Sequence, residues 1–152
     1  MTSSRIRGFT LIELVVVITI LGILAAFAIP RFISLDTTAR SATVTGLAGT
    51  VRSAAALARG MSMATGNAAS VTMEGQVVTL ANNYPDASAG GIGNAINLSN
   101  GDFNFTPGAP AATGTATWQR VGAGNGATCE VTYTPPAAAG AVPVIGSPTA
   151  GC

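Results

Sequence analysis

The side chains that enzymes use most often for catalysis are scarce in this sequence. Its 152 residues include no histidine and two cysteines, Cys129 and Cys152. Acid–base catalysis by histidine, zinc sites built from His and Cys, and Ser/His/Asp triads are therefore excluded. No pairing of nucleophile and base, phosphate-binding glycine loop or cluster of metal ligands is visible in the sequence. We expect no enzyme activity, no catalytic residue, no metal site and no cofactor.

Charged residues are also few, and their sign is unevenly distributed. They make up 9% of the chain, against roughly 25% in typical globular proteins. The mean hydropathy of +0.49 excludes a strongly charged disordered chain. Seven arginines face six acidic residues, but Arg120 is the one basic residue after residue 59. The later part offers no basic surface, so we expect no direct nucleic-acid binding.

One ionisable residue, Glu13, lies inside a long apolar run. Residues 9–29 read FTLIELVVVITILGILAAFAI. As a helix, this run spans about 32 Å, against about 30 Å for the hydrocarbon core of a bilayer. It is longer than the apolar region of an ordinary signal peptide, and Arg5 and Arg7 precede it. By the positive-inside rule, the N-terminus stays in the cytoplasm and the chain after Pro30 is exported.

The start of the chain carries a family resemblance. A short basic leader, Gly8, the segment Phe9-Thr10-Leu11-Ile12-Glu13 and the apolar run together resemble prepilins of type IV pili and pseudopilins of type II secretion systems. The resemblance implies cleavage between Gly8 and Phe9 by a prepilin peptidase, followed by N-methylation of the new Phe9 amine. The processed chain keeps five arginines and six acidic residues, so its formal net charge is −1.

Glu13 has two interpretations. A charged side chain near the end of a membrane helix costs roughly a few kcal/mol unless it is paired or reaches water. It could simply extend to the cytoplasmic interface. Alternatively, Glu13 of one subunit pairs with the Phe9 amine of a neighbour, since leaving either charge alone in a packed apolar core is unfavourable. The resemblance also implies this second role, in which Glu13 guides assembly.

We predict one long helix that starts at Phe9 and ends at Arg59 or Gly60. Gly22 and Pro30 weaken helix propagation, and the resemblance implies local unwinding between such positions in assembled fibres. We therefore expect a bend or melt there; one tolerated glycine and a mild kink are the alternative. The second half of the helix is amphipathic and is expected to pack on a sheet through one stripe, formed by Leu47, Val51, Ala54, Ala58 and Met61.

The rest of the sequence reads as short strands between loops. A hairpin is predicted from residues 71–73 and 77–80, and further strands at 115–121 and 129–134, whereas residues 82–93 read as a loop. The closing segment, residues 135–152, is rich in Ala, Gly and Pro. In an oxidising compartment Cys129 and Cys152 allow one intramolecular disulfide, worth about 3 kcal/mol, although free or intermolecular thiols stay possible.

Further points of similarity are the segment ILGILAAFAIPRFISL, Tyr84-Pro85 ahead of Gly91-Ile92, Cys129 in the segment CEVTY and a final Gly-Cys. Within the superfamily, these features resemble mannose-sensitive haemagglutinin (MSHA) type pilins. The resemblance implies an α+β pilin fold: a long N-terminal helix, transmembrane in its first half, on a small antiparallel sheet with a C-terminal disulfide loop. Expected regions are a leader at 1–8, an assembly half at 9–30, an amphipathic half at 31–60 and a β-rich head at 61–152.

The resemblance also implies a location, partners and a function. The chain would lie in the inner membrane before assembly and in an extracellular pilus afterwards. Its partners would be further subunits in a homopolymer, the prepilin peptidase, the inner-membrane assembly machinery and a host or surface receptor. The expected function is that of a structural pilus subunit for attachment and motility. The alternative is a pseudopilin of a type II secretion system.

Overall fold

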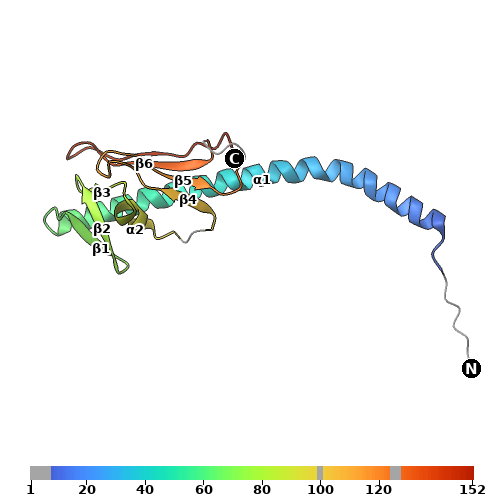
Figure 1. The fold of residues 1–152 in the computed structure, drawn as a ribbon, viewed down its shortest axis with the longest axis horizontal. Coiled ribbons are helices and arrows are strands. Elements are labelled where there is room, and N and C mark those ends of the chain that lie inside the picture. The colour runs from blue at the N-terminus through green and yellow to red at the C-terminus, as the bar shows by residue number, and fades with distance from the viewer. Residues whose placement is uncertain (1–7, 99–100, 124–127) are drawn as a thin grey trace, which may run out of the picture. The chain divides into compact units, whose positions relative to one another are not determined.

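The computed structural model describes residues 8–98, 101–123 and 128–152, apart from the side chains of residues 30–34. The chain divides into two compact units, Met1–Thr37 and Thr38–Cys152. The first unit holds the start of helix α1 (Leu11–Ala64), and the second holds the rest of α1 and all the strands (Figure 1). The long N-terminal helix and the β-rich remainder confirm the α+β class that the sequence predicts.

Helix α1 extends beyond the predicted end at Arg59 or Gly60, so that boundary is wrong. Its last turn is held by packing: Ser62 is fully buried and Met61 packs beside a small apolar cluster on the strands. The Ser62 hydroxyl donates to the Ala68 carbonyl at 3.2 Å. The chain leaves the helix at Gly66, where φ is +82°, a value that glycine adopts without strain. Tertiary contacts therefore outweigh the weak helix propensity of Gly60.

The helix also continues through Gly22 and Pro30, so the predicted unwinding is absent from the single chain described here. In an isolated subunit, unwinding would break backbone hydrogen bonds with no packing contact to compensate. Local unwinding of residues 22–30 in an assembled fibre stays a prediction.

The second half of α1 is buried along one stripe, as predicted. Ala54 and Met61, which the sequence places on this stripe, lie half-buried at its edge. The buried positions recur with the helical period of three or four residues. They are Val44, Leu47, Ala48, Val51, Ala55, Ala58 and Ser62.

Two antiparallel sheets take the place of the single small sheet expected. The first has the order β1–β2–β3, from β1 (Ser70–Met73), β2 (Gln76–Ala81) and β3 (Tyr84–Pro85). The predicted hairpin is confirmed: Met73 pairs with Gln76, and Glu74 and Gly75 form the turn with φ of 49° and 81°. Two positive φ values suit the right-handed twist of a hairpin. Where a loop was predicted, β3 and a π-helical turn, η1 (Ala89–Gly93), lead into α2 (Asn94–Ile96).

The second sheet has the order β4–β5–β6–β7. The predicted strands correspond to β5 (Ala116–Arg120) and β6 (Glu130–Thr134), whereas β4 (Phe103–Thr106) and β7 (Val144–Gly146) were not predicted. Trp118 and Tyr133 of the central strands are buried against Val51 and its neighbours on α1. The Tyr133 hydroxyl donates to the Pro85 carbonyl at 2.7 Å, and so joins the second sheet to the first.

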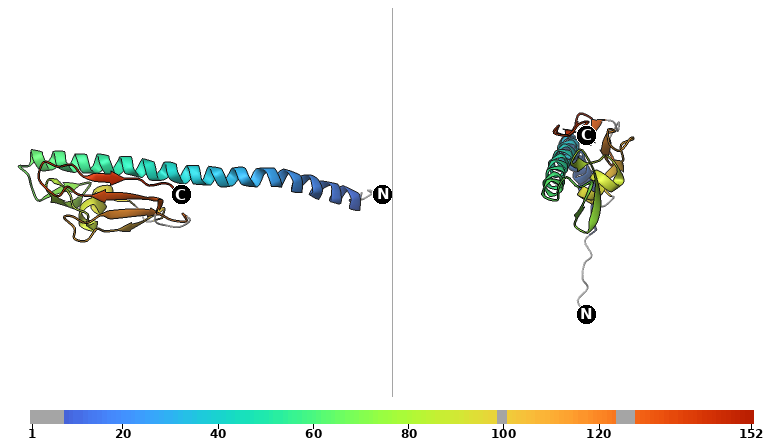
Figure 2. Two further views of the ribbon diagram at one scale, coloured as in Figure 1. Left: turned by 90° about the horizontal axis from the view of Figure 1, so that it is seen from above. Right: turned by 90° about the vertical axis from the view of Figure 1, so that its left-hand side faces the viewer.

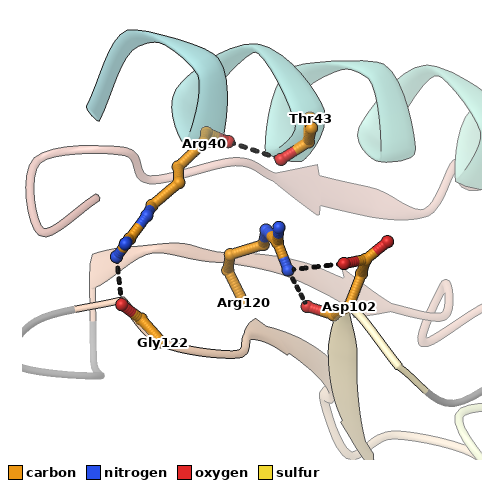
Figure 3. Close-up of polar contacts among 5 residues, drawn as sticks. All are labelled: Arg40, Thr43, Asp102, Arg120 and Gly122. Carbon is orange, nitrogen blue, oxygen red and sulfur yellow. Dashed lines mark hydrogen bonds and ion pairs between the residues drawn. The ribbon is translucent and has the colours of Figure 1, made fainter. Parts of the chain in front are cut away.

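Two arginines hold loops of the second sheet (Figure 3). Arg40 of α1 donates to the carbonyl of Gly122, just after β5. Arg120 donates to the Asp102 carbonyl at 2.6 Å and to its carboxylate at 3.0 Å. Its guanidinium also lies 5.5 Å from the centre of the Phe103 ring. These contacts connect α1, the start of β4 and the end of β5.

Candidate processing and assembly site

The predicted cleavage site lies in non-helical backbone. Residues 8–10 precede α1, which begins at Leu11, and both Gly8 and Phe9 are exposed. The Phe9 side chain is 83% exposed. A peptide bond outside a helix can adopt the extended form that a peptidase active site requires. The Gly8–Phe9 bond is therefore accessible, while the rest of the leader, residues 1–7, lies outside the described residues.

Thr10 and Glu13 form a reciprocal cap at the start of α1. The Thr10 backbone N–H and hydroxyl both donate to Glu13 Oε2, at 2.9 and 2.7 Å. In return, the Glu13 backbone N–H donates to the Thr10 hydroxyl at 3.3 Å. This is a capping box, which satisfies donors that every helix start leaves without intrahelical partners. Our sequence reasoning missed Thr10, although the T-x-x-E spacing before an apolar run is its signature.

The cap fixes the direction of the Glu13 carboxylate. Because Oε2 binds Thr10, the carboxylate is turned back toward the residue whose amine cleavage would release. The other oxygen, Oε1, has no hydrogen-bond partner within the part of the chain that the structure describes. Glu13 lines a shallow groove together with Phe9, Ile12, Val16 and Val17. An acceptor on an apolar face is suited to one cationic donor from outside the chain.

From Leu11 to Ile29, the helix is long and apolar enough to cross a membrane. Residues Leu11–Ile29 have a mean hydropathy of 2.8, and none of this span is buried within the chain. A core helix of a soluble protein would bury most of such a surface. This exposed apolar surface requires a cover, either lipid or other apolar helices.

The remaining predicted residues lie elsewhere. Gly22 and Pro30 lie farther along α1, and the disulfide joins Cys129 and Cys152 in the second unit, as the sequence allowed. Cys129 is fully buried in the core beside Val131. Among the described residues, no group of three His, Cys, Asp or Glu side chains is placed to hold a metal ion.

The comparisons with known proteins match the start of the chain and part of its length. Residues 3–29 match the family model described as the prokaryotic N-terminal methylation motif. The chain is 56% identical over 54 residues to the type IV narrow pilus major component PilA5 of Thermus thermophilus, covering 36% of this chain and 47% of the relative. It is 68% identical over 31 residues to the type IV major pilin protein PilA of Myxococcus xanthus, covering 20% of this chain and 14% of that relative.

The chain therefore spans less than half the length of either relative, and neither is described as an MSHA pilin. No solved structure matches it. Together, the motif and the relatives bear out the resemblance drawn from the segment GFTLIEL. The chain carries a prepilin-type N-terminal methylation motif and is homologous to type IV pilins over part of its length.

Proposed function

We propose that this protein is a structural subunit of a type IV pilus, built from many copies of the processed chain. The observation that carries the proposal is the methylation motif at residues 3–29 on a helix whose apolar span is exposed. An apolar helix that leaves lipid loses no hydrophobic burial if it packs among identical helices. The bilayer thus acts as a reservoir of subunits for the filament.

The cap at the helix start supplies the proposed assembly contact. Cleavage at Gly8–Phe9 creates a cationic amine, and Glu13 Oε1 is an acceptor without a partner in the described chain. Within a bundle of apolar helices, an unpaired amine or carboxylate is strongly unfavourable because neither reaches water, so the amine of one subunit and the carboxylate of the next are expected to pair. The pairing would set the axial position of each new subunit.

Mass spectrometry of filaments sheared from cells tests the main proposal. We expect the chain to start at Phe9, with a methylated amine and an intact Cys129–Cys152 disulfide. An unprocessed chain in the filaments, or a chain present only in membrane or periplasmic fractions, would contradict it. Recovery confined to the periplasm and membrane is the outcome expected for a secretion pseudopilin.

Two substitutions of Glu13 test the assembly contact. Glu13→Ala is expected to leave export intact but to lower filament yield. Glu13→Gln keeps a side-chain oxygen for the cap and removes only the charge, so it separates the ion pair from helix capping. We expect both variants to accumulate as processed subunits in the membrane. Wild-type piliation of Glu13→Gln would show that the charge has no role.

Attachment to surfaces is the more specific part of the proposal. Its basis is the resemblance of the sequence to MSHA-type pilins, with motility as a further role. The processing enzyme would be a prepilin peptidase, and the assembly machinery would lie in the inner membrane. Adhesion assays that compare wild-type cells with cells lacking this chain test attachment. Competition with free mannose tests whether the attachment is mannose-sensitive, as the resemblance to MSHA-type pilins implies.

A further inference from the structure

A small aromatic cavity lies between α2 and the strands β4 and β5 in the unit Thr38–Cys152. Its volume is about 300 Å³, which is near the lower end of the range for small-molecule sites. Every described residue that lines it is uncharged. We define the aromatic cavity by the residues around it, which are Gly93, Asn94, Leu98, Phe103, Phe105 and Trp118.

Three aromatic residues line the cavity. The ring centres of Phe105 and Trp118 lie 4.9 Å apart. Phe103 and Trp118 are buried, whereas Phe105 is half-buried. The Phe105 ring packs closely on the backbone of residue 93, since a Cβ atom on Gly93 would lie 3.2 Å from a ring carbon. The Phe105 ring is therefore held between Gly93 and Trp118, and part of its surface is open to a ligand.

Two polar groups at the cavity lack a hydrogen-bond partner in the described chain. The indole N–H of Trp118 makes no hydrogen bond with a described residue, although Trp118 is only 2% exposed. Among those residues, Arg120 Nε is the one fully buried side-chain nitrogen or oxygen without a partner, so the Trp118 nitrogen is open to solvent. The Asn94 amide nitrogen donates to the Val77 carbonyl at 2.8 Å. The Asn94 side-chain oxygen accepts no hydrogen bond from the described residues.

These features together indicate a neutral, ring-shaped ligand with hydroxyl groups. A hydroxyl group both donates and accepts, so two hydroxyls of one ligand can pair with the Trp118 N–H and the Asn94 oxygen. The C–H bonds of a sugar ring carry a small positive charge, which the negative face of an aromatic ring attracts. A purely apolar ligand would leave the Trp118 N–H without a partner, which costs about 1–3 kcal/mol. An anionic ligand would find no cation among the described residues that line the cavity.

We infer that the aromatic cavity binds one ring of a neutral sugar, such as the terminal hexose of a surface polysaccharide. This inference deepens the proposed attachment function and rests on it for its role in the cell. The position of the cavity suits that role. In this unit the strands and α2 lie along one side of α1 (Figures 1 and 2), and no described residue of α1 lines the cavity. Subunits that pack through α1 therefore leave it open.

Fluorescence of the purified full chain tests the site directly. Trp118 is the single tryptophan of the sequence, so the tryptophan emission reports on this cavity. The detergent must carry no sugar head group, because such a group would compete for the site. We expect at least one of mannose, glucose and galactose to shift the emission with a Kd on the order of 1–10 mM. No shift with any of the three sugars up to about 100 mM would overturn the inference.

Two bulky substitutions show whether the cavity is the place where the sugar binds. Ala89 is exposed and also lines the cavity, so Ala89→Phe is expected to fill the opening and to weaken binding about tenfold or more. Ala112→Phe is the matched control, because Ala112 is exposed and does not line the cavity. Equal affinities of these two variants for the sugar would overturn the assignment to this cavity.

Phe105→Leu separates sugar recognition from apolar burial. The variant keeps an apolar side chain but loses the aromatic face, so hexose binding should weaken about fivefold. The affinity for toluene, used as an apolar probe, should stay within about twofold of the wild-type value. Equal losses for hexose and toluene, or binding of toluene alone by the wild type, would identify a merely apolar cavity and overturn the inference.

Failure of the sugar site differs from failure of the proposed function. Filaments that contain the processed chain, together with no hexose binding, would overturn the sugar site and leave the pilus subunit standing. Hexose binding by the purified chain, together with its absence from every filament, would overturn the pilus subunit and the role of the cavity in attachment.

Discussion

At the scale of single residues, the hydroxyl of Thr10 controls where the Glu13 carboxylate points. Thr10→Val keeps the shape of the side chain and removes both hydrogen bonds of the hydroxyl. The loss of a helix cap typically costs about 1 kcal/mol. We expect faster amide hydrogen exchange at residues 11–13 in detergent, and a lower filament yield because the carboxylate is no longer held in one orientation for the amine of a neighbouring subunit.

Thr19→Val is the matched control for this experiment. The Thr19 hydroxyl, on the same apolar span, donates only to helix carbonyls, among them that of Val16 at 3.3 Å. Its removal leaves the start of the helix unchanged, so exchange at residues 11–13 should stay at the wild-type rate. If Thr10→Val assembled as well as Thr19→Val, the cap would have no part in assembly.

Tyr133 is a buried residue whose shifted pKa makes the stability of the fold depend on pH. Burial raises the pKa of its phenol far above the ordinary value, with smaller contributions from Tyr84 and Asp86. Because the folded state holds this proton more tightly, the stabilisation is complete below pH ~10, the pKa of an unfolded tyrosine, and is lost as the pH rises above it. Urea unfolding of the full chain in detergent should therefore show a stability decline from about pH 10.

Tyr133→Phe shows how much of the pH dependence of stability comes from Tyr133 and how much from other titratable groups. The variant leaves the buried Pro85 carbonyl without its donor at 2.7 Å, so we expect a loss of about 1–3 kcal/mol at pH 7. The decline above pH 10 should be shallower than in the wild type. Identical pH profiles for the two proteins would show that the Tyr133 proton does not contribute.

At the scale of elements, the turn after β3 depends on a close approach at Gly91. A Cβ atom there would lie 2.0 Å from Asp86 Oδ1 and 2.4 Å from the Asp86 carbonyl oxygen. That carbonyl accepts the backbone N–H of buried Ile92 at 2.9 Å. Gly91→Ala should therefore displace η1 and cost about 1–3 kcal/mol, as overpacking does.

Gly90→Ala is the control, because its Cβ would meet the Ser88 and Thr79 hydroxyls at an ordinary 3.8 Å. We expect it to change the free energy of unfolding by less than about 1 kcal/mol. Urea titration of both variants measures the difference. Equal stability of the two alanine variants would show that η1 adapts to a side chain at residue 91.

Elements with a local signal could be predicted from the sequence, and those that depend on partners could not. The turn residues Glu74 and Gly75 lie between two β-rich runs, so the hairpin was evident. In contrast, β7 lies in an Ala/Gly/Pro-rich segment and is a strand because Val144 and Ile145 pair with β6. The end of α1 past Gly60 likewise follows from the burial of Ser62.

At the candidate site, Phe9 and Glu13 stand out by residue type, whereas the Thr10 cap is recognised only by the T-x-x-E spacing, a rule that we did not apply.

At the scale of the whole molecule, the proposed function requires one helix to serve two environments. Its apolar span is exposed along its length, which suits lipid before assembly and neighbouring helices afterwards. In the single chain the helix is continuous through Gly22 and Pro30. Both residues lower the free energy needed to unwind it, by about 1 and 3 kcal/mol relative to alanine. Transfer from lipid to the packed core of a filament can therefore unwind the helix between Gly22 and Pro30.

Gly22→Ala/Pro30→Ala tests whether this weakness serves assembly. The variant helix resists unwinding, so we expect normal processing and membrane insertion but fewer and shorter filaments. Cryo-electron microscopy of wild-type filaments should show non-helical backbone between residues 22 and 30. Ala25→Val is a control that changes an apolar residue of the same segment and leaves Gly22 and Pro30 in place. A continuous helix in the wild-type filament would mean that these two residues act only while the chain is in the bilayer.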